Sequence, residues 1–327
     1  MFAAISGNRI ALSTLVAAVA LAVVFTAADI MPAASQDTQL LAYQVKPDDT
    51  PEAPWSAAWN ARPAVVVLSA QNVTRPMGGG EVATVRVRAL HDNQRLYVLL
   101  EWSDKSKDEL VNGQNRFADA AAVEMPPTAG VSVPSFCMGD AQGSVNIWQW
   151  KASWQRDIES GFATASDLYP GGFVDAPSPA DDIFLPALAL GNPVAQRSRA
   201  TPVENLVAAG FGTLTTANLQ DIDGAGEWRD GRWRVVFFRP LVTAEGYPSL
   251  AVGDVTDVAF AVWDGSRGHR DGMKSVSQFM KLQLGVSARP EGAGGEGWWA
   301  WVLAAGIGAA ALIAILWAFL VPLRSNE

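Results

Sequence analysis

The sequence has very little cysteine or histidine, and this excludes several common kinds of redox and metal site. Cys137 is the single cysteine of 327 residues, so an intramolecular disulfide, a four-thiolate iron–sulfur cluster and a Cys-x-x-Cys-His haem attachment are all excluded. His91 and His269 are too few for a histidine-rich metal site. The net charge is −9 with no basic stripe, which argues against nucleic acid as a partner.

The N-terminus has the three-part layout of a secretory signal peptide. Residues 1–9 carry one positive charge, an apolar run extends over 10–25, and small residues follow it. Ala33 and Ser35 suit the −3 and −1 positions of a cleavage site. We therefore expect residues 1–35 to be a signal peptide, with an uncleaved N-terminal anchor as the alternative.

The C-terminus contains a long uncharged apolar run. Trp298–Leu323 would extend about 39 Å as a helix, which exceeds the ~30 Å hydrocarbon core of a bilayer. This run predicts a transmembrane helix, and Arg324 after it predicts that 324–327 is a cytoplasmic tail. The main domain, 36–286, is then expected on the periplasmic or extracytoplasmic side of the cytoplasmic membrane. The Gly-rich residues 287–297 are interpreted as a linker.

The main domain is rich in period-two patterns that predict β-strands. The stretch "TVRVRALHDNQRLYVLLEW" (84–102) alternates in two halves about a polar turn, and "DVTDVAFAVWDGS" (254–266) predicts a further strand. Asp230-Gly231 between two aromatic-rich segments predicts a hairpin. We expect an all-β domain, an antiparallel β-sandwich with long loops at 125–143 and 157–216, plus the C-terminal transmembrane helix.

Two segments remain as candidates for chemistry. In "PSFCMGDAQGSVNIWQWKASWQRD", Met138 stands beside Gly139 in a loop, where its thioether is sterically free to meet a large flat ligand. In "GHRDGMKSVSQFMKLQL", Lys274 stands where a polar loop enters a strand. Taken alone, such a methionine usually fills gaps in a core and such a lysine is a surface residue. The acidic stretch "DIDGAGE" (221–227) has part of the oxygen-ligand spacing of a calcium loop.

Together these segments give the chain a resemblance to a known family. The pieces "ALHDNQRLYVLLEWSDKSKD", "CMGDAQGSVNIWQWKA", "WRVVFFRPL" and "VAFAVWDGSRGHRDGMKSVSQF" resemble the haem-binding γ subunits of the ethylbenzene dehydrogenase group. That group lies in the type II dimethyl-sulfoxide-reductase family and includes the dimethylsulfide dehydrogenase, selenate reductase and chlorate reductase γ subunits. The resemblance implies one non-covalent b-type haem with Met138 and Lys274 as axial ligands. Arg267 and Arg270 are then candidate partners of the haem propionates.

This ligand pair is chemically coherent with electron transfer. A lysine ligand must lose its proton, which burial and the charge of the iron both favour. A thioether on the opposite side stabilises ferrous iron and raises the potential. Other donors stay open as alternatives: His269 in the same loop, and Lys151, Met273 or Met280.

The resemblance also implies partners. The chain is expected to be a non-catalytic subunit that relays electrons between a molybdenum-containing catalytic subunit with its iron–sulfur subunit and either cytochrome c or a membrane cytochrome b. The familiar γ subunits are soluble periplasmic proteins, so the expected C-terminal span is a departure from the pattern. The alternatives are a membrane-anchored β-sandwich module that binds carbohydrate or another small ligand without haem, and a structural subunit that tethers a partner.

Overall fold

The computed structural model describes residues 39–46, 49–111, 116–128, 138–140, 143–164, 171–172 and 186–288. The predicted signal peptide or anchor at 1–35, most of the predicted linker at 287–297, the predicted span at 298–323 and the tail at 324–327 lie outside the described residues.

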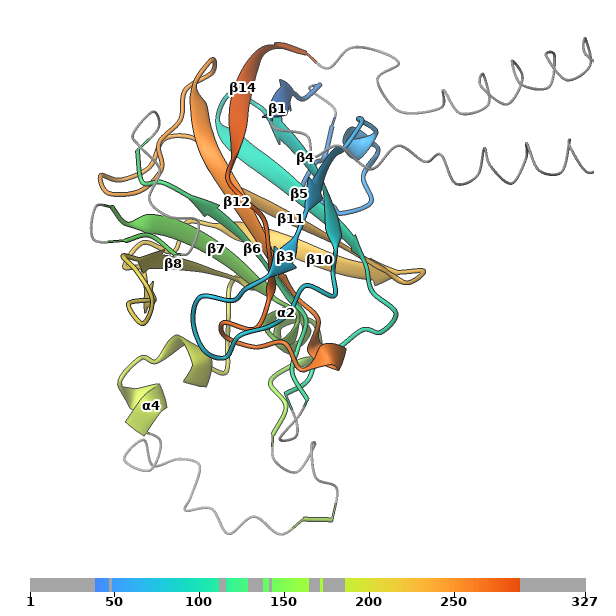
Figure 1. Cartoon of the computed structure of the whole chain (residues 1–327), viewed down its shortest axis with the longest axis vertical. Coiled ribbons are helices and arrows are strands. Elements are labelled where there is room, and N and C mark those ends of the chain that lie inside the picture. Colours follow the sequence, from blue (N-terminus) through green and yellow to red (C-terminus); the bar gives the residue numbers. More distant parts are fainter. Residues whose placement is uncertain are drawn as a thin grey trace, which may run out of the picture. The chain divides into compact units, whose positions relative to one another are not determined.

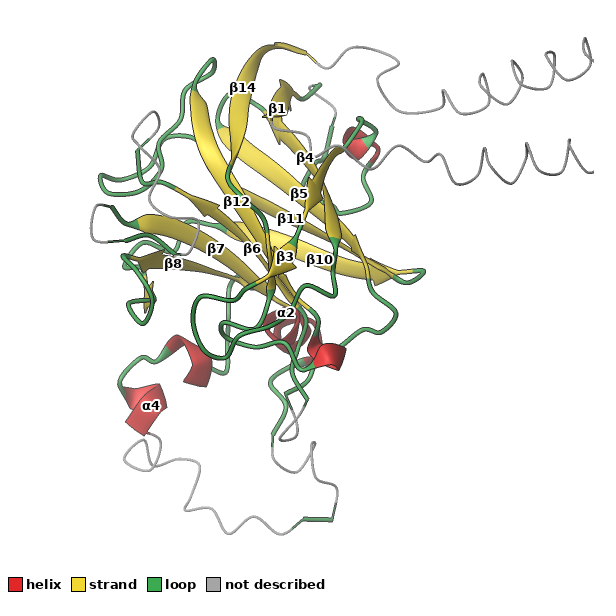
Figure 2. Cartoon of the chain, in the orientation of Figure 1, coloured by secondary structure: helices red, strands yellow, loops and turns green. Residues whose placement is uncertain are grey.

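The described part of the chain is mostly β-sheet, with short helices between the strands (Figure 2). The strands are β1 Gln39–Gln44, β2 Ala64–Val67, β3 Ser69–Ala70, β4 Thr84–His91, β5 Arg95–Ser103, β6 Ala120–Met125, β7 Val145–Lys151, β8 Val203–Ala208, β9 Thr215–Thr216, β10 Asp223–Arg229, β11 Arg232–Pro240, β12 Val255–Trp263, β13 Ser275–Val276 and β14 Met280–Ala288. The helices are η1 Ala57–Trp59, α2 Ala152–Ser160, α4 Pro186–Ala189, η3 Pro193–Ala195 and η4 Gly265–Arg267.

The strands form a 14-stranded sheet in the order β10-β11-β5-β4-β1-β14-β12-β6-β7-β8-β9, with β2, β3 and β13 off this path. The strand β12 joins two parts of the sheet, because it pairs with β14 on one side and with β6 on the other. In Figure 1, β12 lies between the β6–β7–β8 half and the β14 side of the sheet. The predicted hairpin is confirmed: Asp230 and Gly231, at φ 51° and 74°, turn β10 into β11.

The predicted fold class was wrong in its sheet type and in its transmembrane helix. The sheet is mixed, because β1 pairs in parallel with both β4 and β14. The predicted loop at 157–216 also contains the end of α2 and the strand β8. No helix among the described residues has the length and apolar character needed to cross a membrane. The C-terminal transmembrane helix is therefore not supported, and the residues on which it rested, 298–323, lie outside the described part.

Tryptophans fill the core between the two halves of the sheet. The ring of Trp150 on β7 meets that of Trp233 on β11 edge-on, with centroids 4.9 Å apart, and Trp233 stacks on Trp102 of β5 at 6.3 Å. All three side chains and Trp148 are almost completely buried. These four tryptophans are therefore packing residues, since aromatic side chains of this size dominate core energetics.

Gly226 allows this packing, and we predict that it tolerates no side chain. A Cβ at this position on β10 would lie 2.2 Å from Cζ2 of Trp150. Gly226→Ala is therefore expected to cost about 1–3 kcal/mol of stability through overpacking. Thermal unfolding measures this as a lower Tm, whereas Ala225→Ser, on the opposite face of the strand, is expected to change stability by less than about 0.5 kcal/mol. Equal Tm values for Gly226→Ala and wild type would contradict the packing account.

Candidate functional site

The outward face of the β6–β7–β8–β12 half carries small and apolar residues. The alternation of β6 sends Ala122 and Glu124 to this face, because its intervening residues join the core. Ala122 pairs with Ala261 of β12, and Glu124 lies between Ile147 of β7 and Ala259 of β12. The alanines leave a shallow floor, and such a floor can receive a flat ligand.

A cavity of about 350 Å³ opens on this face, within the ~300–1,000 Å³ usual for ligand sites. A smaller recess, which Glu124 lines, adjoins this cavity, and the two have seven lining residues in common, including Met138 and Lys274. The lining residues common to both are Thr74, Met138, Ile147, Phe211, Trp263, Gly272 and Lys274. The structure therefore brings together the two residues that the resemblance singled out, although 136 positions separate them in the sequence.

Met138 is held in an unusual backbone conformation. Its φ is +74°, in the left-handed region that non-glycine residues rarely adopt, and Gly139 follows at +77°. A Cβ at Gly139 would lie 2.8 Å from the Gly143 carbonyl oxygen, so the loop needs glycine there. The Met138 carbonyl accepts a hydrogen bond from the Gly210 N–H at 2.9 Å. The Met138 side chain packs on the apolar cluster of this face, which directs it at the cavity.

Lys274 is positioned through its backbone. Its N–H donates to the Gly78 carbonyl and its own carbonyl accepts from the Gln71 N–H, both at 3.3 Å. A Cβ at Gly79 would lie 2.3 Å from the Lys274 carbonyl oxygen, so only glycine permits this approach. Lys274 Nζ lies 5.0 Å from the centre of a Trp263 ring, a cation–π distance.

Glu124 is the acidic group of this site. Burial raises the pKa of Glu124 to about 8, while the charge of Lys274 and a hydrogen bond from the Met138 backbone act to lower it. Its Oε1 atom is buried and has no hydrogen-bond partner among the residues that the structure describes. One carboxyl group thus faces both residues of the predicted ligand pair, in a setting where an unpartnered oxygen is costly.

The two predicted propionate partners lie elsewhere. Arg267 is on the exposed helix η4, and the guanidinium of Arg270 lies 4.9 Å from the centre of the Phe117 ring. Neither residue lines the cavity, whereas the exposed Arg75 does. A basic group is thus present at the cavity, from a segment that the sequence did not single out.

The alternative donors are engaged outside the cavity. His269 is buried, with Nδ1 accepting from the Asp264 N–H at 3.1 Å and Nε2 bonded to Glu81 Oε2 at 2.6 Å. Lys151 pairs with Glu204, and Met280 is buried in the main core. Met273 is not among the cavity's lining residues. The geometry therefore favours Met138 and Lys274 over each alternative.

The sequence interpretation missed Glu124 and the role of the Gly78–Gly80 run. Glu124 is the last residue but one of the short strand "AAAVEM", where a charged residue follows alanines on its own face. That pattern was the available signal. The sequence carries no local signal for the role of the glycine run, since its close contact with Lys274 joins segments almost 200 residues apart.

Comparisons with known proteins agree on one family. The ethylbenzene dehydrogenase family profile matches residues 56–171 and 200–275, a region that includes Met138 and Lys274. A protein of Haloferax mediterranei named as a respiratory nitrate reductase heme subunit is 30% identical over 279 residues, which cover 84% of each chain. The chlorate reductase subunit gamma of Ideonella dechloratans is 28% identical over 68% of this chain and 75% of its own. The dimethylsulfide dehydrogenase subunit gamma of Rhodovulum sulfidophilum is 30% identical over 58% of this chain and 56% of its own.

Among solved structures, a carbohydrate binding module of family 9 from Caldicellulosiruptor kristjanssonii in complex with glucose is 11% identical, with a TM-score of 0.36 over 77% of this chain and 97% of that chain. A likeness this weak supports no inference about function. The family profile spans more than half of the chain and the Haloferax relative matches over 84% of both proteins. The chain belongs to the ethylbenzene dehydrogenase family.

Proposed function

We propose that this chain is an electron-transfer subunit that holds one non-covalent b-type haem between Met138 and Lys274. The observation that carries the proposal is that both side chains line one cavity whose floor is made of small and apolar residues. The Haloferax relative is named as a heme subunit, and two further relatives are named as gamma subunits of chlorate reductase and dimethylsulfide dehydrogenase. These names support the cofactor and the place of the chain in a larger complex.

The donor set fits this group. A thioether and a neutral amine are both ligands for haem iron, and the alanine floor with Ile147, Phe211 and Trp263 offers apolar surface to a flat macrocycle. When bound, the haem supplies a one-electron couple. Two protein ligands leave no open position on the iron, so the proposed role is electron relay and not catalysis at this site.

The residues around the cavity can accept the proton that Lys274 must lose to bind iron. Lys274 Nζ must be neutral to act as a ligand. The pKa of Glu124 is raised by burial, and its carboxyl group interacts electrostatically with Lys274. The Glu124 Oε1 atom, which has no hydrogen-bond partner among the described residues, is a suitable acceptor for the proton that the lysine loses. We assign the propionate contact to Arg75 at the cavity, in place of Arg267 and Arg270.

The proposed partners follow from the relatives. We propose that the chain assembles with a molybdenum-containing catalytic subunit and an iron–sulfur subunit, and exchanges electrons with cytochrome c or a membrane cytochrome b. Support comes from the names of the relatives as subunits of chlorate reductase and dimethylsulfide dehydrogenase.

The test of this function is an absorption spectrum of the full-length chain produced with haem supply. Sharp low-spin α and β bands after reduction with dithionite are expected. A protein that stays colourless after reconstitution with haem would contradict the relay and favour a binding module that uses the same cavity for another small ligand.

Filling the floor of the cavity is expected to weaken haem binding without unfolding the domain. Ala261→Leu places a larger side chain on the floor beside Ala122. An overpacking cost of ~1–3 kcal/mol corresponds to binding weaker by roughly 5- to 150-fold, measured by transfer of haem to apomyoglobin. The control Ala251→Leu changes an exposed residue that does not line the cavity. Equal haem-loss rates for the two variants would place the haem elsewhere.

A further inference from the structure

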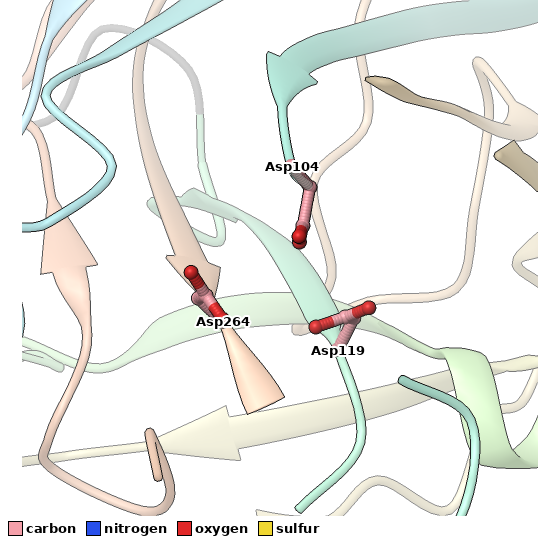
Figure 3. A group of neighbouring side chains, drawn as sticks. All are labelled: Asp104, Asp119 and Asp264. Atoms are coloured by element: carbon pink, nitrogen blue, oxygen red, sulfur yellow. The ribbon is translucent and has the colours of Figure 1, made fainter. Parts of the chain in front are cut away.

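Three aspartates from distant parts of the sequence meet outside this cavity. Asp104 follows β5, Asp119 precedes β6 and Asp264 follows β12. One carboxylate oxygen from each lies within 4.8 Å of the others. Figure 3 shows the Asp104 carboxyl pointing into the space between Asp119 and Asp264. The meeting point therefore joins the ends of three strands.

Hydrogen bonds fix the other two carboxyl groups in place. Asp119 Oδ1 accepts from the Gly265 N–H at 2.8 Å and Oδ2 accepts from Trp233 Nε1 at 2.9 Å. Asp264 Oδ1 accepts from the Ser266 hydroxyl at 2.6 Å. These bonds hold the carboxylates in one geometry, so the cluster is preorganised.

One oxygen in the cluster is buried without a partner. Asp104 is 5% exposed; its Oδ1 accepts from the Ser106 N–H at 3.1 Å, but its Oδ2 makes no hydrogen bond. The Trp102 indole N–H lies near Asp104 but makes no hydrogen bond of normal geometry within the described part of the chain. A buried carboxylate oxygen without a hydrogen bond destabilises the fold unless a cation or a hydrogen-bond donor contacts it.

No protein cation meets it within the described part of the chain. No arginine or lysine there forms an ion pair with the three carboxyl groups, and the nearby Asp108 adds a fourth negative group. The site thus has buried acidic oxygens in excess of the positive charge around them.

We propose that Asp104, Asp119 and Asp264 bind a calcium ion. All the donors are carboxylate oxygens, which hard cations prefer, and Ca²⁺ accepts carboxylates in flexible arrangements of 6–8 oxygens that water completes. Asp104 Oδ2 is the ligand atom for which the described residues provide no hydrogen-bond partner.

The position of this site gives the ion a structural role. Asp264 caps the helix η4, and its carbonyl accepts from the His269 N–H at 3.2 Å. The same loop runs on to Lys274. The ion ties the start of this loop to the ends of β5 and β6, and it does so without contact to the proposed haem. The calcium site and the proposed function can therefore fail independently.

The test compares the Tm of the full-length chain in EDTA and in Ca²⁺, with KCl as an ionic-strength control. At a Ca²⁺ concentration about 100-fold above its Kd, ligand linkage predicts a rise of ~5–10 °C. Asp104→Asn is expected to abolish this rise while leaving the Tm in EDTA equal or higher, because it removes a buried charge and keeps the shape. The control Asp223→Asn changes an exposed residue of "DIDGAGE" and is expected to respond to Ca²⁺ like the wild type.

Terbium gives a second readout that does not depend on unfolding. The indole of Trp233 donates to Asp119 at 2.9 Å, so Tb³⁺ in this site is expected to emit on tryptophan excitation and to be displaced by Ca²⁺. The same emission and Tm rise in Asp104→Asn as in the wild type, or no Tm rise in the wild type, would overturn the proposal. Loss of both responses in Asp223→Asn alone would overturn it as well, since the ion would then bind at 221–227.

Discussion

Lys274→Ala is expected to abolish the low-spin haem spectrum. The substitution removes one of the two proposed axial ligands and leaves an open position on the iron, so the variant is expected to become high-spin and to bind carbon monoxide. Loss of a residue that only supports a metal ligand already weakens metal binding roughly 10–100-fold. Loss of the ligand itself is therefore expected to weaken haem binding by at least about as much. Absorption spectra with and without carbon monoxide measure the change.

Lys281→Ala is the matched control for this experiment. Lys281 lies on β14, its side chain is 57% exposed, and it pairs at 2.8 Å with the largely buried Asp257. Its removal is expected to leave the spectrum unchanged, since Lys281 does not line the cavity. An unaltered low-spin spectrum in Lys274→Ala would show that another residue binds the iron.

Met138→Ala is expected to lower the midpoint potential of the haem. A thioether favours ferrous iron, so its loss shifts the couple toward the ferric form. Axial ligands set haem potentials over a range of about 0.8 V, and a fall on the order of 100 mV is expected here. A potentiometric titration followed at the α band measures it.

The control for Met138 is Met273→Ala, which removes a thioether from the loop before Lys274. Met273 packs near Gly78 and does not line the cavity. The haem midpoint potential of Met273→Ala is therefore expected to match that of the wild type. A fall in potential in Met273→Ala with no change in Met138→Ala would reverse the assignment of the sulfur ligand.

Sequence patterns predicted the local elements better than the long-range pairing. The alternation in 84–102 predicted β4 and β5, and Asp230-Gly231 predicted the β10–β11 turn, because each depends on residues adjacent in the chain. The parallel pairing of β1 with β4 and β14 was missed. Register between distant strands is set by packing of whole faces, and a six-residue strand carries no local signal for its partners.

The cluster of three aspartates and the proximity of Glu124 to Lys274 could not be predicted from the sequence for the same reason. Asp104, Asp119 and Asp264 are separated by 15 and 145 positions, and no spacing rule joins them; the fold alone brings their oxygens within 4.8 Å. Glu124 lies on β6, and Lys274 immediately precedes β13. By contrast, the Met138 and Lys274 segments were found because family resemblance carries long-range information that composition and periodicity lack.

The most direct test of the central claim is electron–nuclear double resonance on the oxidised, haem-loaded chain, with lysine labelled by ¹⁵N at Nζ. The account predicts a strongly coupled ¹⁵N from a lysine on the iron, absent in Lys274→Ala and retained in Lys281→Ala. A sample in which the lysine label shows no coupling, while labelled histidine does, would contradict the account and place an imidazole on the iron.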